Sequence, residues 1–212
     1  FTQIMSWSEL VALYHINDDT PQNTRARYNV SPTQDVPLAR NGDDGREMAP
    51  CSWGLVPFWA KDTKIAFKTI NARSETIAVK PSFRAAFKSR RCLVPADGYY
   101  EWTKTPDGKQ PHRICLPDEG PMSFAGLWER NEKFEMESFT IVTTSAAPSI
   151  EHVHSRMPVI LEEDAYDAWL SEDTATDDAL AMLQPYSGKL NTYPVSRYVN
   201  NSRNEGPECI ER

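Results

Sequence analysis

The sequence predicts an α+β fold: one compact domain, residues 1–212, with a curved, mostly antiparallel sheet that forms a barrel-like core, and a few short helices. Three observations predict it. Many short apolar segments are separated by turn signals, few stretches show helical periodicity, and the chain has 16 prolines, which are poorly tolerated inside helices. No Ser/Gly linker or repeat divides the chain, and 40% hydrophobic residues are enough for a sizeable core.

Helical spacing of apolar residues occurs in four short segments. Residues 6–14 carry it with Ser6 and Ser8 available as caps. Residues 80–90 place Pro81 in the first turn, with Phe83 and Phe87 on one face. Two further short helices are expected at 165–170 and 179–183, after an acidic run.

The remaining apolar segments are predicted to be extended. Residues 41–45 and 106–109 contain Asp-Gly and Pro-Asp-Gly turn signals and are expected to be hairpin loops. The expected extended segments are 27–32, 51–59 (a strand leading into a loop), 92–95, 98–102, 113–116, 122–128, 139–144 and 190–195.

Charge is distributed unevenly. The formal charge is −7, yet residues 61–91 contain nine basic and two acidic residues, and residues 161–178 contain eight acidic residues and no basic one. Aromatic rings at Phe58, Trp59, Phe67, Phe83 and Phe87 are interleaved with the basic run. A cationic groove with stacking rings is typical of proteins that bind single-stranded nucleic acid, although a charge run can also be a solvated surface.

The common catalytic and metal signatures are absent from the sequence. There is no phosphate-binding glycine loop, no nucleophile elbow and no zinc-deaminase motif. The four cysteines never fall in C-x-x-C spacing and are expected to be buried, reduced thiols. His152 and His154 lack a third ligand, so we expect neither a metal nor a cofactor.

Three polar clusters remain as candidates for chemistry. Asn71 lies two residues before Arg73, which puts the amide and the guanidinium on one side of a strand. Glu101 stands in an aromatic run, where burial would raise its pKa and suit it to proton transfer. His154 lies two residues before Arg156. Each cluster alone also has a plain structural explanation, as a cap, an ion pair or a surface histidine.

Taken together, these clusters resemble the SRAP family (SOS response-associated peptidases), whose members recognise abasic sites in single-stranded DNA. The resemblance extends from Phe1 to about Ile210. It is carried by six motifs in order: YNVSP (28–32), WGLVP (53–57), INARSET (70–76), RCLVPADGYYEW (91–102), HSRMP (154–158) and PVS (194–196).

The resemblance implies a mature N-terminal cysteine three residues before Phe1, followed by Gly and Arg. That cysteine would form a reversible thiazolidine link with the abasic sugar, with Asn71, Glu101 and His154 as catalytic groups. The DNA-binding residues implied or suggested by the pattern are Arg73, Arg156, Trp59, Phe58, Pro32, Asn29, Trp102 and Arg84. The chain starting at Phe1 is expected to bind DNA without crosslinking to it.

Two alternative functions stay open: a thiol peptidase or autopeptidase that uses the same cysteine and Glu101, and a passive module that binds single-stranded DNA. No apolar stretch reaches the roughly 18 residues of a membrane span and no signal peptide is visible. We therefore expect a monomer in the cytoplasm, associated with the nucleoid in a bacterium.

Overall fold

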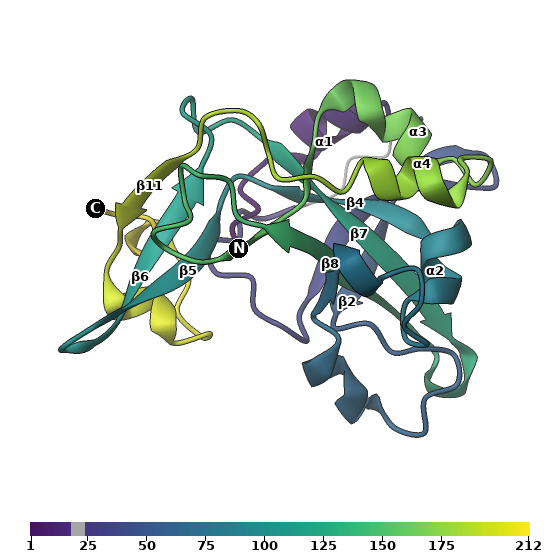
Figure 1. Cartoon of the computed structure of the whole chain (residues 1–212), viewed down its shortest axis with the longest axis horizontal. Helices are drawn as coiled ribbons and strands as arrows, with labels where there is room; N and C mark the ends of the chain where they lie inside the picture. The colour runs from purple at the N-terminus through teal and green to yellow at the C-terminus, as the bar shows by residue number, and fades with distance from the viewer. Residues whose placement is uncertain (18–23) are drawn as a thin grey trace.

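A closed five-stranded barrel forms the centre of the molecule. The computed structural model describes residues 1–17 and 24–212, and Figure 1 shows the arrangement. Around the barrel the strands follow the order β7-β4-β1-β2-β8, and β8 pairs with β7 to close it. These strands are β1 (Asp35–Gly42), β2 (Gly45–Trp53), β4 (Arg91–Ala96), β7 (Met122–Asn131) and β8 (Met136–Ser145).

The barrel is mixed but mostly antiparallel, as the sequence predicts. Its one parallel contact joins β2 to β8 through Ser52 with Ser138 and Trp53 with Phe139. Three short strands extend the sheet: β3 (Asn71–Arg73) runs parallel to β8, β9 (Arg156–Pro158) pairs with β8, and β10 (Ile160–Leu161) pairs with β7. Strands β3 and β9 both carry predicted site residues, so β8 holds them next to each other.

A second, three-stranded antiparallel sheet lies beside the barrel, at the left of Figure 1. Its strands are β5 (Tyr99–Thr105), β6 (Gly108–Cys115) and β11 (Asn191–Pro194). The turn at Pro106–Asp107 joins β5 to β6, as predicted from its Pro-Asp-Gly sequence. The start of the chain passes between the two sheets: the Thr2 N–H donates to the Gly98 carbonyl (2.9 Å) and the Gln3 N–H to the Arg27 carbonyl (2.8 Å).

The helices are short and gather on one side of the barrel (Figure 1). The prediction for residues 6–14 is confirmed: α1 spans Trp7–Tyr14, and Ser6 and Glu9 form a reciprocal capping box. The other α-helices are α2 (Arg84–Ser89), α3 (Tyr166–Leu170) and α4 (Thr176–Ala181). The short 3-10 helices are η1 (Thr63–Lys68), η2 (Ser74–Thr76), η3 (Glu132–Phe134), η4 (Glu163–Ala165), η5 (Arg197–Asn200) and η6 (Pro207–Cys209).

Two predicted helix boundaries are wrong. Residues 81–83 form turns, and α2 begins only at Arg84, because the Phe83 backbone (φ −125°, ψ −30°) departs from helical geometry. The helix expected at 179–183 begins three residues earlier, at Thr176, with Asp177 and Asp178 in its first turn, where carboxylates favour a helix N-terminus. Within the described residues, no helix is long and apolar enough to cross a membrane.

The core has two large parts, one on each face of the barrel wall, and two small clusters outside them. Strand β4 is buried along its whole length because Cys92 and Val94 point to one part and Leu93 to the other. The first part fills the barrel and the space toward the second sheet, and it includes Phe1 and Phe124. The second part lies under the four helices. The barrel wall is therefore covered on its helical side, while the opposite side is left for a site.

Candidate functional site

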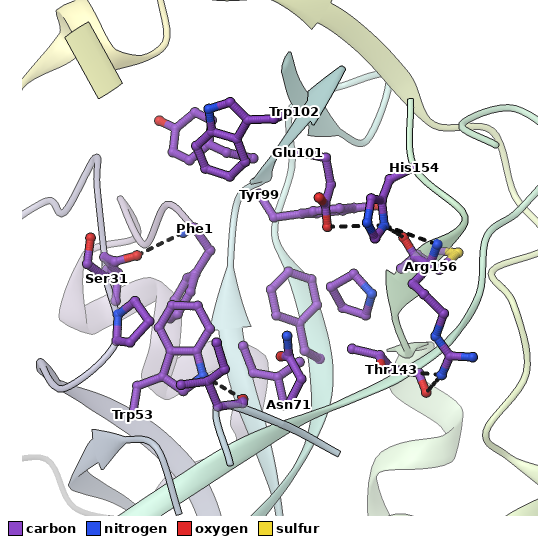
Figure 2. Close-up of a pocket in the computed structure, with 18 of the residues that line it drawn as sticks. Phe1, Ser31, Trp53, Asn71, Tyr99, Glu101, Trp102, Thr143, His154 and Arg156 are labelled. Carbon is purple, nitrogen blue, oxygen red and sulfur yellow. Dashed lines mark hydrogen bonds and ion pairs between the residues drawn. The ribbon is translucent and has the colours of Figure 1, made fainter. Parts of the chain in front are cut away.

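A cavity of about 560 Å³ lies between the barrel and the second sheet. Five segments enclose it: β3 and β9 from the barrel side, β5 from the second sheet, the loop around Ser31, and the C-terminal segment around Asn200. In Figure 2, Glu101 and His154 face each other on one side, Phe1 and Trp53 lie on the other, and Asn71 points into the space between. The structure thus brings all three predicted catalytic residues to one cavity.

The start of the chain is fixed at this cavity. The Phe1 nitrogen donates to the Val30 carbonyl at 3.0 Å, and the Val30 N–H donates back to the Phe1 carbonyl at 2.8 Å. The Phe1 ring packs edge-on against Trp53 (5.2 Å between centroids) and Phe124 (6.1 Å). Trp53 is held in turn by a hydrogen bond from its indole N–H to the Ile70 carbonyl (2.8 Å). Phe1 is therefore held in the cavity wall by both its backbone and its ring.

Asn71 and Arg73 are placed by strand alternation. Strand β3 pairs with β8 in parallel, and its central residue, Ala72, is completely buried against the core. The side chains on either side of Ala72 therefore point the opposite way, toward the cavity. The prediction that Asn71 and Arg73 share one side of a strand is confirmed.

Glu101 and His154 form a close acid–base pair. Glu101 Oε1 lies 3.8 Å from His154 Nδ1. Burial raises the pKa of the Glu101 carboxyl above its usual value, and the nearby His154 partly counteracts that rise. His154 Nδ1 also lies 3.1 Å from both the backbone nitrogen and the carbonyl oxygen of Arg156, so the Arg156 backbone orients the ring in either tautomer. This pair can deliver protons and take them up inside the cavity.

The Arg156 guanidinium is engaged by the protein itself. It forms a bidentate pair with Glu75, and its Nη2 also donates to the Thr143 carbonyl at 2.7 Å. The hydrogen bonds from Arg156 lower the pKa of Glu75 to about 2. Arg156 lines the cavity, as predicted, but it can bind a phosphate only by exchanging one of these partners.

The remaining predicted wall residues also lie at the cavity. Pro32 forms part of the Ser31 loop, and the Trp102 indole N–H donates to the Asn200 side-chain oxygen at 2.7 Å. Asn29 is nearly buried, and its amide nitrogen lies within 3.1 to 3.2 Å of three backbone carbonyls, those of residues 199, 201 and 204. Asn29 therefore ties the C-terminal wall of the cavity to the Ser31 loop.

Three predicted DNA-binding residues lie outside the cavity. Phe58 and Trp59 are 62% and 45% exposed in the turn that follows β2, and Arg84 is exposed at the start of α2. None of the three lines the cavity, and their role in DNA binding stays a prediction.

Sequence reasoning assigned no role to several cavity residues. Tyr99 lies on the same face of β5 as Glu101, two residues away, and its hydroxyl is buried without a hydrogen-bond partner. The period-2 pattern around Glu101 could have revealed it. Thr143 and Glu75 could not be found from sequence, because they meet Arg156 only through the pairing of β3, β8 and β9.

The cysteines lie apart from this chemistry. All four are free and buried, as predicted, and burial raises the pKa of the Cys51 thiol to about 12. Within residues 1–17 and 24–212, no three His, Cys, Asp or Glu side chains are arranged to hold a metal ion. The groups that can act chemically are those of the cavity.

Known proteins resemble this chain along its full length. The abasic site processing protein YoqW of Bacillus subtilis (strain 168) is 38% identical over 218 residues, covering 100% of this chain and 97% of YoqW. The abasic site processing protein HMCES of Xenopus tropicalis is 34% identical, covering 86% of this chain and 65% of HMCES. A crystal structure of a Bacteroides thetaiotaomicron protein superposes with a TM-score of 0.86 at 27% identity, covering 100% of this chain and 97% of that one. The model of the family described as SOS response associated peptidase (SRAP) matches residues 1–202, and this chain belongs to that family.

Proposed function

We propose that this protein binds single-stranded DNA at an abasic site and links to it covalently through an N-terminal cysteine three residues before Phe1. The observation that carries the proposal is the convergence of Phe1, Asn71, Glu101 and His154 on one cavity. Three extended residues reach about 10 Å, so a cysteine at that distance from the fixed Phe1 nitrogen can enter the same space. Relatives named abasic site processing proteins support the choice of lesion.

The chemistry follows from the aldehyde of a ring-opened abasic sugar. The cysteine amine adds to the aldehyde carbon, the carbonyl oxygen takes up protons and leaves as water, and an imine remains. The thiol sulfur then adds to the imine carbon and its proton passes to the nitrogen, which closes a five-membered thiazolidine. An α-amine is suited to the first step because its ordinary pKa, about 7.7–8.0, leaves part of it unprotonated near neutral pH.

The cavity residues have matching roles in this proposal. Glu101, whose pKa is raised by burial, holds a proton closer to neutral pH than an exposed carboxyl does and can protonate the departing oxygen. His154, 3.8 Å away, acts as acid and base on the deoxyribose as it opens. The Asn71 amide orients the amine or the sugar.

DNA binding is assigned to the cavity rim and its neighbours. Arg73 projects from β3 and binds a backbone phosphate, and Arg156 contributes if Glu75 releases it. Phe58 and Trp59 stack on bases, and Arg84 adds positive charge. Pro32 and Trp102 shape the cavity where the strand bends.

The decisive experiment uses the protein with cysteine as its first residue, three positions before Phe1. Incubation with single-stranded DNA that holds one abasic site should give an adduct that survives a denaturing gel. The matched control is the same strand after borohydride reduction, which removes the aldehyde and should abolish the adduct. Glu101→Ala and His154→Ala should slow formation by about 100-fold, while Arg73→Ala should mainly weaken binding.

The absence of any adduct from a correctly processed cysteine terminus would refute the crosslinking proposal. Release of an N-terminal peptide by the same protein, blocked by the same Glu101→Ala substitution, would instead favour the peptidase alternative. An equal loss of DNA binding in Glu101→Ala, His154→Ala and Arg73→Ala would favour a passive module that binds single-stranded DNA.

A further inference from the structure

Exposed apolar side chains are concentrated in one stretch of the chain. Within the described residues, five large hydrophobic side chains are exposed, and four of them lie between residues 58 and 79. Phe67 is the most exposed aromatic ring, at 68%, although it belongs to η1. Lys64 and Lys68 are exposed on the same turn. An exposed ring between two lysines is the combination that holds single-stranded nucleic acid.

The outward position of Phe67 is built into the local structure. Its neighbour Ala66 is buried beneath Gly54, whose left-handed backbone (φ 127°) brings it so close that a Cβ there would lie 2.7 Å from the Ala66 carbonyl oxygen. Thr69 ends the turn and donates to the Leu55 carbonyl at 2.6 Å. Because Ala66 must face the barrel, Phe67 must face away from it.

The η1 turn is joined rigidly to the turn that carries Phe58 and Trp59. Ala60 and Ala66 pack together with Val56 in one small buried cluster. The Asn131 amide donates to the Pro57 carbonyl at 2.7 Å, and Lys133 Nζ donates to the Lys61 carbonyl at 2.8 Å. These contacts hold the two turns together as one preorganised surface.

This surface leads directly to the cavity. Thr69 and Ile70 connect η1 to β3, where Asn71 and Arg73 line the cavity, and the Ile70 carbonyl accepts the hydrogen bond from Trp53. A strand with its lesion in the cavity and its phosphate on Arg73 would continue along η1. The exposed side chains of Lys61, Lys64, Lys68 and Arg73 give this path a positive charge, which complements phosphates.

We propose that η1 is a second DNA-binding site, outside the lesion cavity, that holds nucleotides flanking the abasic site: Phe67 stacks on an unpaired base, and Lys64 and Lys68 bind the adjoining phosphates. The inference rests on the proposed function for the identity of the ligand. It adds a footprint that extends beyond the lesion and does not depend on the cysteine chemistry.

The test measures equilibrium binding by fluorescence anisotropy with undamaged and abasic single-stranded oligonucleotides of two lengths, one that fills only the cavity and one about ten nucleotides longer. Phe67→Ala should weaken binding of the long strand about 5- to 100-fold and leave the short strand within twofold. Phe67→Leu is the matched control, because it keeps an apolar side chain and removes the ring; it should bind like Phe67→Ala. Lys64→Gln with Lys68→Gln should reduce the slope of log K against log salt by about 1.4.

Equal affinity of wild type and Phe67→Ala for the long strand would overturn the inference. Full affinity of Phe67→Leu would also overturn it, because stacking needs the ring. Both outcomes can be told apart from a failure of the proposed function. If Phe67→Ala binds the long strand like wild type while the adduct still forms on a short abasic strand, only the inference about η1 is overturned. A denaturation midpoint within 2 °C of wild type confirms that the variants are folded.

Discussion

The buried position of the Glu101 carboxyl favours proton transfer but lowers the stability of the folded protein when the carboxyl is charged. Burial raises its pKa, so the folded protein holds a proton more tightly than the unfolded chain does. Stability therefore falls as pH rises from the unfolded value, about 4.3, through the raised folded value, and the full cost applies above both. The raised pKa instead serves the proposed reaction, in which the Glu101 carboxyl donates a proton.

We predict that Glu101→Gln raises the thermal midpoint at pH 8 by about 2–4 °C for each kcal/mol recovered, with no gain below about pH 4, where the wild-type carboxyl is protonated in both states. Thermal denaturation at both pH values tests this. Glu208→Gln, at an exposed position of the C-terminal segment, is the control and should change neither midpoint. A loss of stability in Glu101→Gln at pH 8 would contradict the argument.

The Glu75 carboxylate competes with DNA for Arg156. It occupies both terminal nitrogens of the guanidinium, yet the pair is partly exposed, so it contributes at most about 1 kcal/mol to stability. We predict that Glu75→Gln tightens binding of single-stranded DNA several-fold and increases the salt dependence, because Arg156 becomes available to a phosphate. Anisotropy titrations at two salt concentrations measure both.

Asp167→Asn is the matched control for that substitution. Asp167 pairs with Arg46 outside the cavity, with its own side chain exposed, so its loss removes the same charge without releasing a cavity residue. Equal tightening in both variants would mean that net charge, rather than Arg156, is responsible.

At the scale of elements, the C-terminal wall of the cavity depends on one side chain. Asn29 bonds the carbonyls of residues 199, 201 and 204, which lie in and after η5. We predict that Asn29→Ala destabilises the protein by about 1–3 kcal/mol, because buried carbonyls lose their donor. Hydrogen exchange should accelerate over residues 197–204 before it accelerates in the barrel.

Asn41→Ala offers a comparison, because the Asn41 amide makes a single such bond, to the Leu170 carbonyl at 3.2 Å. It should cost less and leave exchange at residues 197–204 unchanged. Uniformly faster exchange across the barrel in Asn29→Ala would mean that Asn29 supports the whole fold rather than this wall.

The elements also show how far sequence reasoning reaches. Strand β4 was predictable because Cys92, Leu93 and Val94 form a continuous apolar run, which a strand buried on both faces requires. Strand β1 was not, because Asp35–Gly42 contains Pro37 and polar outward residues, and it is a strand through its pairing with β2 and β4. The predicted start of α2 was wrong because the Phe83 backbone is not helical, a local detail that apolar periodicity does not report.

The same division applies to the site. Asn71, Glu101 and His154 lie in three short polar motifs that each have a plain explanation alone. Their joint resemblance to the SRAP family indicated them as candidates, and the fold places all three at one cavity. The residues that contact and orient the site residues were not identified from the sequence. Glu75 lies 81 residues from Arg156 along the chain, and no sequence pattern states that they touch.

At the scale of the whole molecule, two opposing charge regions coexist on an acidic protein. The net charge of −7 would repel DNA if it were spread evenly, but the basic run and the acidic run at residues 161–178 lie in separate parts of the chain. Local charge, rather than net charge, governs encounter with a strand at distances shorter than about 8–10 Å in physiological salt.

Closure of the barrel by β8 has a kinetic consequence. Strand β8 pairs locally with β7 and β9, but it must also pair with β2 and β3, which lie far earlier in the chain. Ser52 is paired with Ser138 and Asn71 with Ile141, and contacts of such long sequence separation form slowly. Asn71 and His154 reach the cavity only through those pairings. A chain still emerging from the ribosome or only partly folded therefore lacks the assembled acid–base groups, so any reactivity at its N-terminus would be restrained until folding is complete.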